Sequence, residues 1–325
     1  MSNHQKFEGC KPGIYLLNGP ELTPKSSPRT SHIPATLRKD PMLICRTPSE
    51  MHTACHDLRA PTHTLGLVPT MGALHAGHLS LIAAARTECD LVATSIFVNP
   101  TQFAPGEDYE SYPRTFDEDC RKLESAGVQV LFAPSATDMY PTGNTTFVDP
   151  GEIATRLDGA SRPGHFRGVA TIVARLFHIV APDRAYFGQK DAAQVAVLRH
   201  IVRDLNFAVH IAVCPIIREP DGLALSSRNR YLSPEDRTRA LILSRALHAA
   251  ESMATNGETH SETIRAAILT VLASDPLVRL DYAAIVDPDT LLPIPNTSQG
   301  ALIAVAAWIG NTRLIDNLLL ERLSF

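Results

Sequence analysis

Residues 65–78, LGLVPTMGALHAGH, decide the expected fold. Residues 65–68 are a short apolar run that predicts a buried strand, and Pro69 ends it. From His78 to Glu88 apolar side chains recur at helical spacing, which predicts a helix directly after the strand. Two glycines and His75 occupy the connection between them, and His78 begins the helix.

The same alternation continues on both sides of this stretch. Further strands are expected at residues 91–98, 128–133, 184–187 and 209–213, with helices from 116 to the glycine at 127, at 169–179 and at 192–205. The apolar run at residues 42–45 is a possible first strand. Alternation of this kind predicts βαβ units, a parallel sheet and the α/β fold class.

The pattern changes after about residue 218. Residues 233–236, SPED, combine an N-cap serine, a proline at the first helical position and two first-turn acids, so a helix is expected to run to Met253. A second helix is expected at 261–273 and strands at 280–286 and 301–308. These elements predict a smaller α+β domain.

The amino-terminal residues differ from the rest of the chain. Residues 1–41 are rich in proline, serine, threonine and lysine and sustain no apolar period, which predicts a disordered extension and makes Met42 a plausible start. The expected division is therefore 1–41, 42–218 and 219–325.

Composition excludes several classes of protein. The 325 residues, 44% of them hydrophobic, fit a globular chain of two domains. A net charge of -4 disfavours a nucleic-acid binder. The six cysteines form no CxxC pair, which argues against a zinc ribbon and a disulfide framework and favours reduced thiols in a cytoplasm. No apolar run reaches the length of a membrane span, and no signal peptide is evident.

The histidine-containing connection indicates a phosphate site. Ligands of open α/β sheets bind where parallel strands end, and a helix N-terminus there offers free N–H groups. His75 and His78 are three residues apart, so both can face a ligand, while Gly72 and Gly77 allow its close approach. A pair of helix-capping histidines is the alternative, and zinc is disfavoured because no third ligand is nearby.

Two later motifs strengthen this interpretation. Residues 188–191, GQKD, place Lys190 after a strand as a point charge for phosphate, although a surface lysine explains the tetrapeptide nearly as well. Residues 225–228, LSSR, offer two hydroxyls and a guanidinium, and alone they are an ordinary loop. Together with the HxGH motif of residues 75–78, residues 225–228 give the two-motif layout of adenylate-forming nucleotidyltransferases.

Seven stretches then make the chain resemble the pantoate–β-alanine ligases. They are PTMGALHAGH (69–78), SIFVNPTQF (95–103), EDYESYPR (107–114), SRPGHFRGV (161–169), YFGQKD (186–191), DGLALSSRNRYL (221–232) and AAWIGNTRLIDN (306–317). The resemblance covers residues 42–325. It implies a Rossmann-like domain, a smaller carboxyl-terminal lid, a homodimer, and condensation of pantoate with β-alanine through a pantoyl adenylate, with Mg²⁺ and ATP.

The resemblance also implies roles for individual residues. His75, His78 and Lys190 would be catalytic. The implied ATP contacts are Met71, Gly72, Ala73, Leu74, His75, Ala76, Gly77, His78, Gly188, Gln189, Lys190, Asp191, Ile217, Leu225, Ser226, Ser227 and Arg228. Gln102 and Gln194 would bind pantoate, and Gln102 would also border β-alanine. Glu118 and Asp119 match metal ligands of some members, although an acidic first turn of a helix explains them as well. Arg162 and His165 match a pair that lines the site.

The sequence departs from the family at two of these positions. Gln189 stands where many members have glutamate, and Leu225 stands where others have methionine. An aminoacyl-tRNA synthetase-like enzyme is an alternative, which the acidic balance and the lack of an RNA-binding domain disfavour. A second alternative is an inactive nucleotide-binding relative. Such a protein is expected to have lost His78, Lys190 or the SSR motif (residues 226–228), and all of these are present in the sequence.

Overall fold

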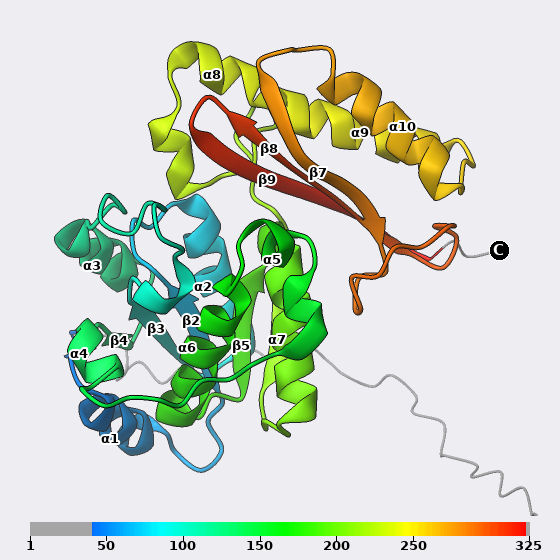
Figure 1. Ribbon diagram of the computed structural model, residues 1–325. Helices are drawn as coiled ribbons and strands as arrows, with labels where there is room; N and C mark the ends of the chain where they lie inside the picture. Colours follow the sequence, from blue (N-terminus) through cyan, green and yellow to red (C-terminus); the bar gives the residue numbers. More distant parts are fainter. Residues whose placement is uncertain (1–40, 323–325) are drawn as a thin grey trace, which may run out of the picture. The chain divides into compact units, whose positions relative to one another are not determined.

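A six-stranded parallel sheet forms the core of the larger part of the protein (Figure 1). The computed structural model describes residues 41–322, so the disorder expected for residues 1–40 lies outside them. Along the sheet the strands follow the order β1 (Leu43–Cys45), β4 (Val130–Phe132), β3 (Leu91–Ile96), β2 (Leu65–Thr70), β5 (Arg184–Gly188) and β6 (His210–Cys214). The α/β fold class expected from the sequence is confirmed.

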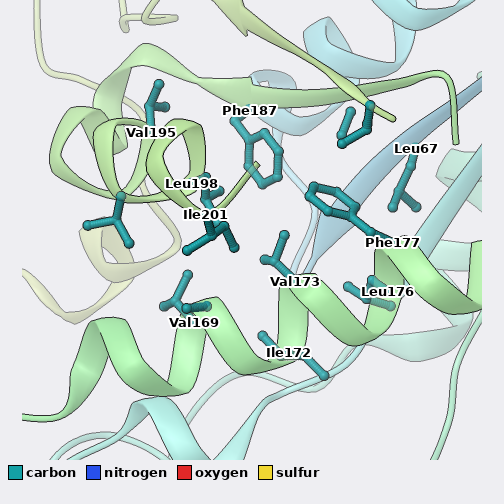
Figure 2. Packing of buried hydrophobic residues seen from close by; sticks show 14 of the residues in the cluster. Leu67, Val169, Ile172, Val173, Leu176, Phe177, Phe187, Val195, Leu198 and Ile201 are labelled. Carbon is teal, nitrogen blue, oxygen red and sulfur yellow. The ribbon is translucent and has the colours of Figure 1, made fainter. Parts of the chain in front are cut away.

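Helices cover both faces of this sheet. On one face lie α1 (Pro48–Leu58), α6 (His165–Val180) and α7 (Ala192–Asp204), whose apolar side chains form a single cluster with the strands. Figure 2 shows the part of this cluster that α6 and α7 form with β2 and β5. On the other face, α2 (Ala76–Glu88) and α3 (Phe116–Ser125) bury Ile82 and Leu123 against the sheet. The strands are apolar on both sides because both sides are covered.

The strand order reverses between β2 and β5. From β2 the chain adds β3 and β4 on one side, and β5 and β6 then extend the sheet on the other side. Strands β2 and β5 are neighbours, with Gly66 opposite Arg184. Ligands of open parallel sheets bind beyond the carboxyl ends of the strands at such a reversal. The HxGH and GQKD motifs follow β2 and β5 and therefore meet there.

The second sheet is antiparallel and contains β7 (Val278–Val286), β8 (Ala301–Ile309) and β9 (Thr312–Leu320). Helices α9 (Leu241–Thr255) and α10 (Ser261–Leu272) pack on one of its faces. Leu302 and Ala304 of β8 belong instead to the apolar cluster that contains α7. All described residues form one compact unit, and the second sheet contributes side chains to both apolar clusters.

Three elements differ from the sequence expectation. Helix α1 was not expected, although Thr47 caps it with a side-chain bond from the N–H of Glu50. Strand β9 was also missed, and a two-residue turn at 310–311 joins it to β8, with Ile309 paired to Thr312. The single helix expected from 233 to 253 is divided at Ala240 into α8 (Pro234–Arg239) and α9.

Short elements complete the chain. They are η2 (Pro100–Gln102), α4 (Ala136–Met139), η3 (Gly151–Thr155), α5 (Asp158–Ser161), η4 (Gln189–Asp191) and η5 (Ser227–Tyr231). The five cysteines between residues 41 and 322 are all unpaired. Within that range, none of the helices combines the length and apolar character needed to cross a membrane. The domain boundaries at 41/42 and 218/219 stay a prediction.

Candidate active site

The histidine-containing loop joins the end of β2 to the first turn of α2. Its His75 is the N-cap of α2, and Nδ1 of this ring accepts a hydrogen bond from the N–H of Gly77 at 3.1 Å. Nδ1 of His78 accepts one from the N–H of His75 at 3.3 Å. A neutral imidazole whose Nδ1 accepts carries its proton on Nε2. Both rings are therefore fixed as Nε2–H donors.

Both histidines are held in the neutral form. Burial, followed by the charge of Lys190, lowers the pKa of His75 to about 4. Burial, followed by the adjacent His75 ring and then Lys190, lowers the pKa of His78 to about 3. The ring centroids are 4.1 Å apart, so a charge on either would repel a charge on the other. The pair offers hydrogen-bond donors at neutral pH and no positive charge.

Gly77 makes room for this arrangement. A Cβ atom at position 77 would lie 2.9 Å from Cε1 of His75, closer than such atoms approach one another. From the sequence, Gly77 is expected to allow close approach of a ligand. Its first effect in the structure is to admit the ring of its own neighbour.

The buried carboxylate of Asp119 supports the loop from α3. Its oxygens accept hydrogen bonds from the N–H groups of Ala73 and Leu74 at 2.9 and 2.8 Å, and from the hydroxyl of Thr115 at 3.0 Å. Asp119 is fully buried, and Gly72, at φ +86°, lies against its Oδ2. The carboxylate thus replaces partners that the backbone of a tight turn lacks.

The two residues suggested as metal ligands have other partners. Asp119 uses both oxygens in the loop, and the exposed Glu118 forms an ion pair with Lys122 at 2.7 Å. Between residues 41 and 322, no group of three histidines, cysteines or acids is placed to hold a metal ion. The metal-ligand role of Glu118 and Asp119 stays a prediction, and these contacts disfavour it.

The GQKD motif lies at the end of β5 and is fixed by β9. Asn317 of β9 donates hydrogen bonds from Nδ2 to the carbonyl groups of Gln189 and Lys190, both at 2.9 Å. Nε2 of Gln189 donates to Oδ1 of Asn317 at 3.1 Å. A glutamine at this position therefore has a specific role, because its amide can donate where a glutamate carboxylate could not. These contacts leave the Lys190 ammonium group free to approach the histidines.

A cavity of about 190 Å³ brings predicted residues from four motifs together. Its lining includes His78, Gln102, Asp191, Gln194 and Arg228. A smaller adjoining cavity of about 60 Å³ shares Asp191, Gln194 and Arg228 and adds Lys190 and Ser226. Residues as distant in the sequence as His78 and Arg228 are thus gathered at one sheet edge.

Other predicted ATP contacts are not part of either lining. They are Gly72, Ala73, Leu74, His75, Ala76, Gly77, Gly188, Gln189, Ile217, Leu225 and Ser227. Met71 lines the larger cavity. Ile217 and Leu225 are joined through a backbone hydrogen bond of 2.9 Å beside the SSR motif. The assigned contacts of all these residues stay predictions.

Gln102 is placed by residues on both sides of it. Its Oε1 accepts from Nδ2 of Asn99 at 3.0 Å, and its carbonyl oxygen lies 2.8 Å from Nδ1 of His165. Nη1 of Arg162 lies 3.0 Å from Nε2 of His165; because a guanidinium only donates, His165 carries its proton on Nδ1 and donates to Gln102. Burial, followed by the charge of Arg162, lowers the pKa of His165 to about 4. The site-lining pair thus orients the Gln102 backbone.

The SSR motif forms the start of η5. Oγ of Ser226 accepts from the N–H of Arg228 at 3.3 Å, and Oγ of Ser227 lies 3.3 Å from the hydroxyl of Tyr112. The guanidinium of Arg228 contacts both oxygens of Asp108, at 3.0 and 3.1 Å. Neither Asp108 nor Tyr112 was assigned a role from the sequence, although both lie in the EDYESYPR motif.

Comparisons with known proteins give matches over most of the chain. The family model described as pantoate-beta-alanine ligase matches residues 43–319. The pantothenate synthetase of Acidobacterium capsulatum is 61% identical over 259 residues, which are 80% of this chain and 87% of that protein. The crystal structure of pantothenate synthetase from Thermus thermophilus has a TM-score of 0.80 and 48% identity, covering 85% of this chain and 99% of the other.

A second solved structure is described with bound molecules. The pantoate-beta-alanine ligase of Francisella tularensis, complexed with beta-gamma ATP and β-alanine, has a TM-score of 0.70 and 38% identity. It covers 86% of this chain and 97% of its own. These proteins share both the fold and most of the length of the chain.

Proposed function

This chain belongs to the pantoate–β-alanine ligase family, and from that premise we propose that it condenses pantoate with β-alanine to pantothenate at the expense of ATP. The reaction would pass through a pantoyl adenylate and release AMP and pyrophosphate. The observation that carries this proposal is the cavity that joins His78, Gln102, Gln194 and Arg228. It combines donors suited to phosphate with two neutral amides suited to hydroxyl and carboxylate groups.

In the first step, a carboxylate oxygen of pantoate attacks the α-phosphorus of ATP. A carboxylate O–P bond forms, the bond to the bridging oxygen breaks, and its electron pair leaves with pyrophosphate. The Nε2–H groups of His75 and His78 would donate to oxygens on which negative charge develops, and Lys190 and Arg228 would supply positive charge. No enzyme nucleophile is needed.

In the second step, the neutral amine of β-alanine attacks the acyl carbon of the adenylate. A C–N bond forms, the C–O bond to AMP breaks with its electron pair leaving on the AMP oxygen, and the nitrogen releases a proton to solvent. Gln102 and Gln194 would hold the pantoyl group without adding charge near the incoming amine. Strands of the parallel sheet line the larger cavity, and residues of η5 and β9 line the smaller one beside it, which would limit attack by water.

Magnesium would enter this site with the nucleotide. Besides Asp158, which forms an ion pair with Arg313, the cavities offer the carboxylate of Asp191 and no cluster of three ligands within residues 41–322, which fits an ion held mainly by phosphate oxygens and water. When bound, Mg²⁺ would neutralise phosphate charge. We propose it as the cofactor, with Asp191 as the carboxylate available to it.

Product analysis without β-alanine tests the adenylate step. Pantoate and Mg-ATP alone should yield pyrophosphate and enzyme-bound pantoyl adenylate, which ³¹P NMR resolves from ATP. β-Alanine should then release AMP. Formation of ADP and inorganic phosphate in place of AMP and pyrophosphate would overturn the proposal.

Replacement of Gln102 tests whether one amide serves both steps. Gln102→Ala should slow pyrophosphate release and, separately, the reaction of preformed adenylate with β-alanine. Gln299→Ala is a matched control, because Gln299 is exposed and lines neither cavity. A Gln102 variant that slows neither step would remove this residue from the site.

We also propose that the enzyme is a cytoplasmic homodimer that binds no nucleic acid. Light scattering at micromolar concentration should report about twice the 35.3 kDa chain mass. The proposed boundary at 41/42 predicts that a chain beginning at Met42 keeps full turnover, in agreement with a family match that begins at residue 43. A monomeric mass, or loss of turnover on truncation, would contradict these two proposals respectively.

A further inference from the structure

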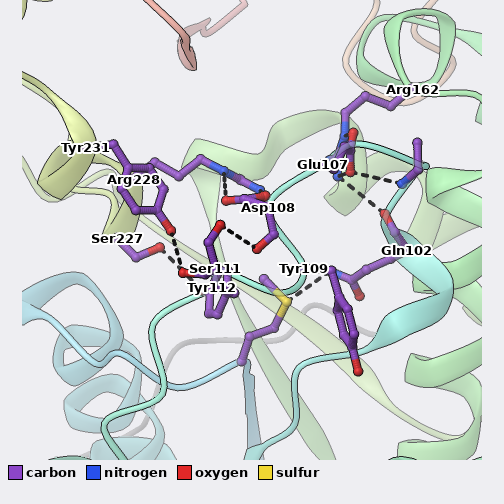
Figure 3. A network of polar contacts seen from close by, with 12 residues as sticks. Gln102, Glu107, Asp108, Tyr109, Ser111, Tyr112, Arg162, Ser227, Arg228 and Tyr231 are labelled. Carbon is purple, nitrogen blue, oxygen red and sulfur yellow. Dashed lines mark hydrogen bonds and ion pairs between the residues drawn. The ribbon is translucent and has the colours of Figure 1, made fainter.

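Residues 104–114 connect the parallel sheet to the arginines of the site. In this segment, the adjacent acids Glu107 and Asp108 each contact a different guanidinium (Figure 3). Glu107 accepts two hydrogen bonds from Arg162, both at 2.6 Å. Asp108 accepts two from Arg228. One dipeptide therefore joins two motifs that are more than 60 residues apart in the sequence.

The contact between Asp108 and Arg228 uses one edge of the guanidinium. Asp108 accepts from Nε at 3.1 Å and from Nη2 at 3.0 Å. An arginine side chain has five N–H donors, so at least three remain, including both on Nη1. Arg228 also lines the cavity that contains His78. The carboxylate thus holds one edge of the guanidinium and leaves the other edge to a ligand.

Burial gives this orientation an energetic basis. The side chains of Arg228 and Asp108 are 31% and 21% exposed, so their contact is partly shielded from water. A two-bond arginine–carboxylate contact fixes the plane of the guanidinium as well as its position. An arginine already fixed in this way loses less conformational freedom when it binds a phosphate.

We propose that Asp108 is a positioning residue for Arg228 in the first half-reaction. Its carboxylate presents the free edge of the guanidinium to the departing pyrophosphate. This inference rests on the proposed function, because it requires that ATP bind in the cavity lined by Arg228. It assigns Asp108 no contact with substrate and a role only through its arginine partner.

The test compares Asp108→Asn with the matched control Glu110→Gln. Glu110 lies in the same segment but is exposed, and its carboxylate forms no ion pair among the described residues. Pyrophosphate release is measured with ATP varied at saturating pantoate, and then with pantoate varied. For Asp108→Asn, kcat/KM for ATP should fall roughly 10- to 100-fold, as expected for a lost hydrogen bond to a charged group. KM for pantoate should stay within about twofold, and Glu110→Gln should match the wild type.

A double-mutant cycle separates positioning from a general structural role. If Asp108 acts through Arg228, Asp108→Asn should add no further loss in an Arg228→Ala background. Asp108→Glu, which keeps the charge, should restore part of kcat/KM for ATP. An additive loss, an unchanged or improved kcat/KM for ATP, or an equal loss in Glu110→Gln would overturn the inference. Absence of pyrophosphate release by the wild type would instead overturn the proposed function.

Discussion

The histidine loop at 71–78 and the arginine segment at 226–231 approach the same cavity but are held in different ways. The histidine loop is fixed by hydrogen bonds to its backbone, from the buried Asp119 and from its own two imidazoles. The arginine segment is fixed through side chains of a distant segment, chiefly by the ion pair with Asp108. The hydrogen bonds that hold the histidine loop join residues at most 46 positions apart in the sequence. The ion pair that holds the arginine segment joins residues 120 positions apart.

This difference corresponds to two kinds of chemistry. Burial in the first region keeps His75 and His78 neutral, with pKa values lowered to about 4 and about 3. The second region keeps a permanently charged guanidinium beside a carboxylate. In the proposed reaction, a phosphate leaving group would therefore meet neutral donors on one side and full positive charge on the other. Each region should respond differently to substitution and to pH.

Loss of a histidine donor should have the largest effect. His78→Ala should reduce single-turnover adenylate formation about 100- to 1000-fold, the usual result of removing a transition-state donor. Pantoate binding, measured by calorimetry, should change little, because His78 would act on the phosphates. Near-normal adenylate formation by this variant would reduce His78 to a helix cap.

The second-largest effect is expected from Asp119, whose carboxylate holds the backbone of the histidine loop. Asp119→Asn replaces one acceptor with an amide donor opposite the N–H of Ala73 or Leu74, so a buried backbone group loses its partner. We expect turnover to fall on the order of 100-fold through displacement of the histidines, and the free energy of unfolding in urea to fall by about 1–3 kcal/mol.

Glu118→Gln is the control for Asp119. Glu118 is exposed on the same helix, and its partner Lys122 retains a hydrogen bond to the carbonyl of Leu74. Stability and turnover should stay close to those of the wild type. If this variant required more Mg²⁺ for turnover, the metal-ligand role suggested by the sequence would be supported.

Much of the fold could be predicted because its signals are local. The apolar strand at 65–68 and the helical period after His78 gave the parallel sheet and its neighbouring helices. Strand β9 was not predicted, because the buried polar side chains of Asp316 and Asn317 interrupt its apolar pattern, although a two-residue turn pairs Ile309 with Thr312 at its start. Helix α1 was missed although its capping residues Thr47 and Glu50 are visible in the sequence.

Only the site residues that belong to recognisable sequence motifs could be predicted. The motifs placed His78, Lys190 and Arg228 near one another, and the cavities agree with that placement. The roles of Asp119 and Asp108 could not be predicted, because each depends on contacts with residues 45 and 120 positions away. Nor does a sequence specify which imidazole nitrogen carries a proton, which here depends on backbone N–H groups.

The pH dependence of stability should sharpen the contrast between neutral and charged groups. The pKa values of His75 and His78 are lowered from about 6.5 in an unfolded chain, so the unfolded state binds protons first. Stability is full above pH 6.5 and falls as the pH decreases toward about 4. Between pH 6.5 and 5 we expect a loss on the order of 1–3 kcal/mol from this pair in urea titrations.

Replacing both His75 and His78 with glutamine measures how much the two imidazoles contribute to the pH dependence of stability. The variant His75→Gln/His78→Gln should have a shallower dependence over the same interval. His165, whose pKa is also lowered to about 4, would leave a residual slope in both proteins. An unchanged slope in the variant would mean that the two rings are not kept neutral by the fold.

The smallest effect should come from the second contact of the arginine segment. Tyr112→Phe removes a hydroxyl that lies 3.3 Å from Oγ of Ser227, while the buried ring keeps its edge contact with Phe103. Ser227 is partly exposed and can bond to water instead. We expect turnover to change less than about threefold and the free energy of unfolding to fall by about 1 kcal/mol or less, because a single neutral hydrogen bond is lost. Ser227→Ala should give a similar result, and the two changes together should be less than additive. A loss above tenfold in Tyr112→Phe would mean that the Tyr112 hydroxyl, and not Asp108 alone, holds the arginine segment in place.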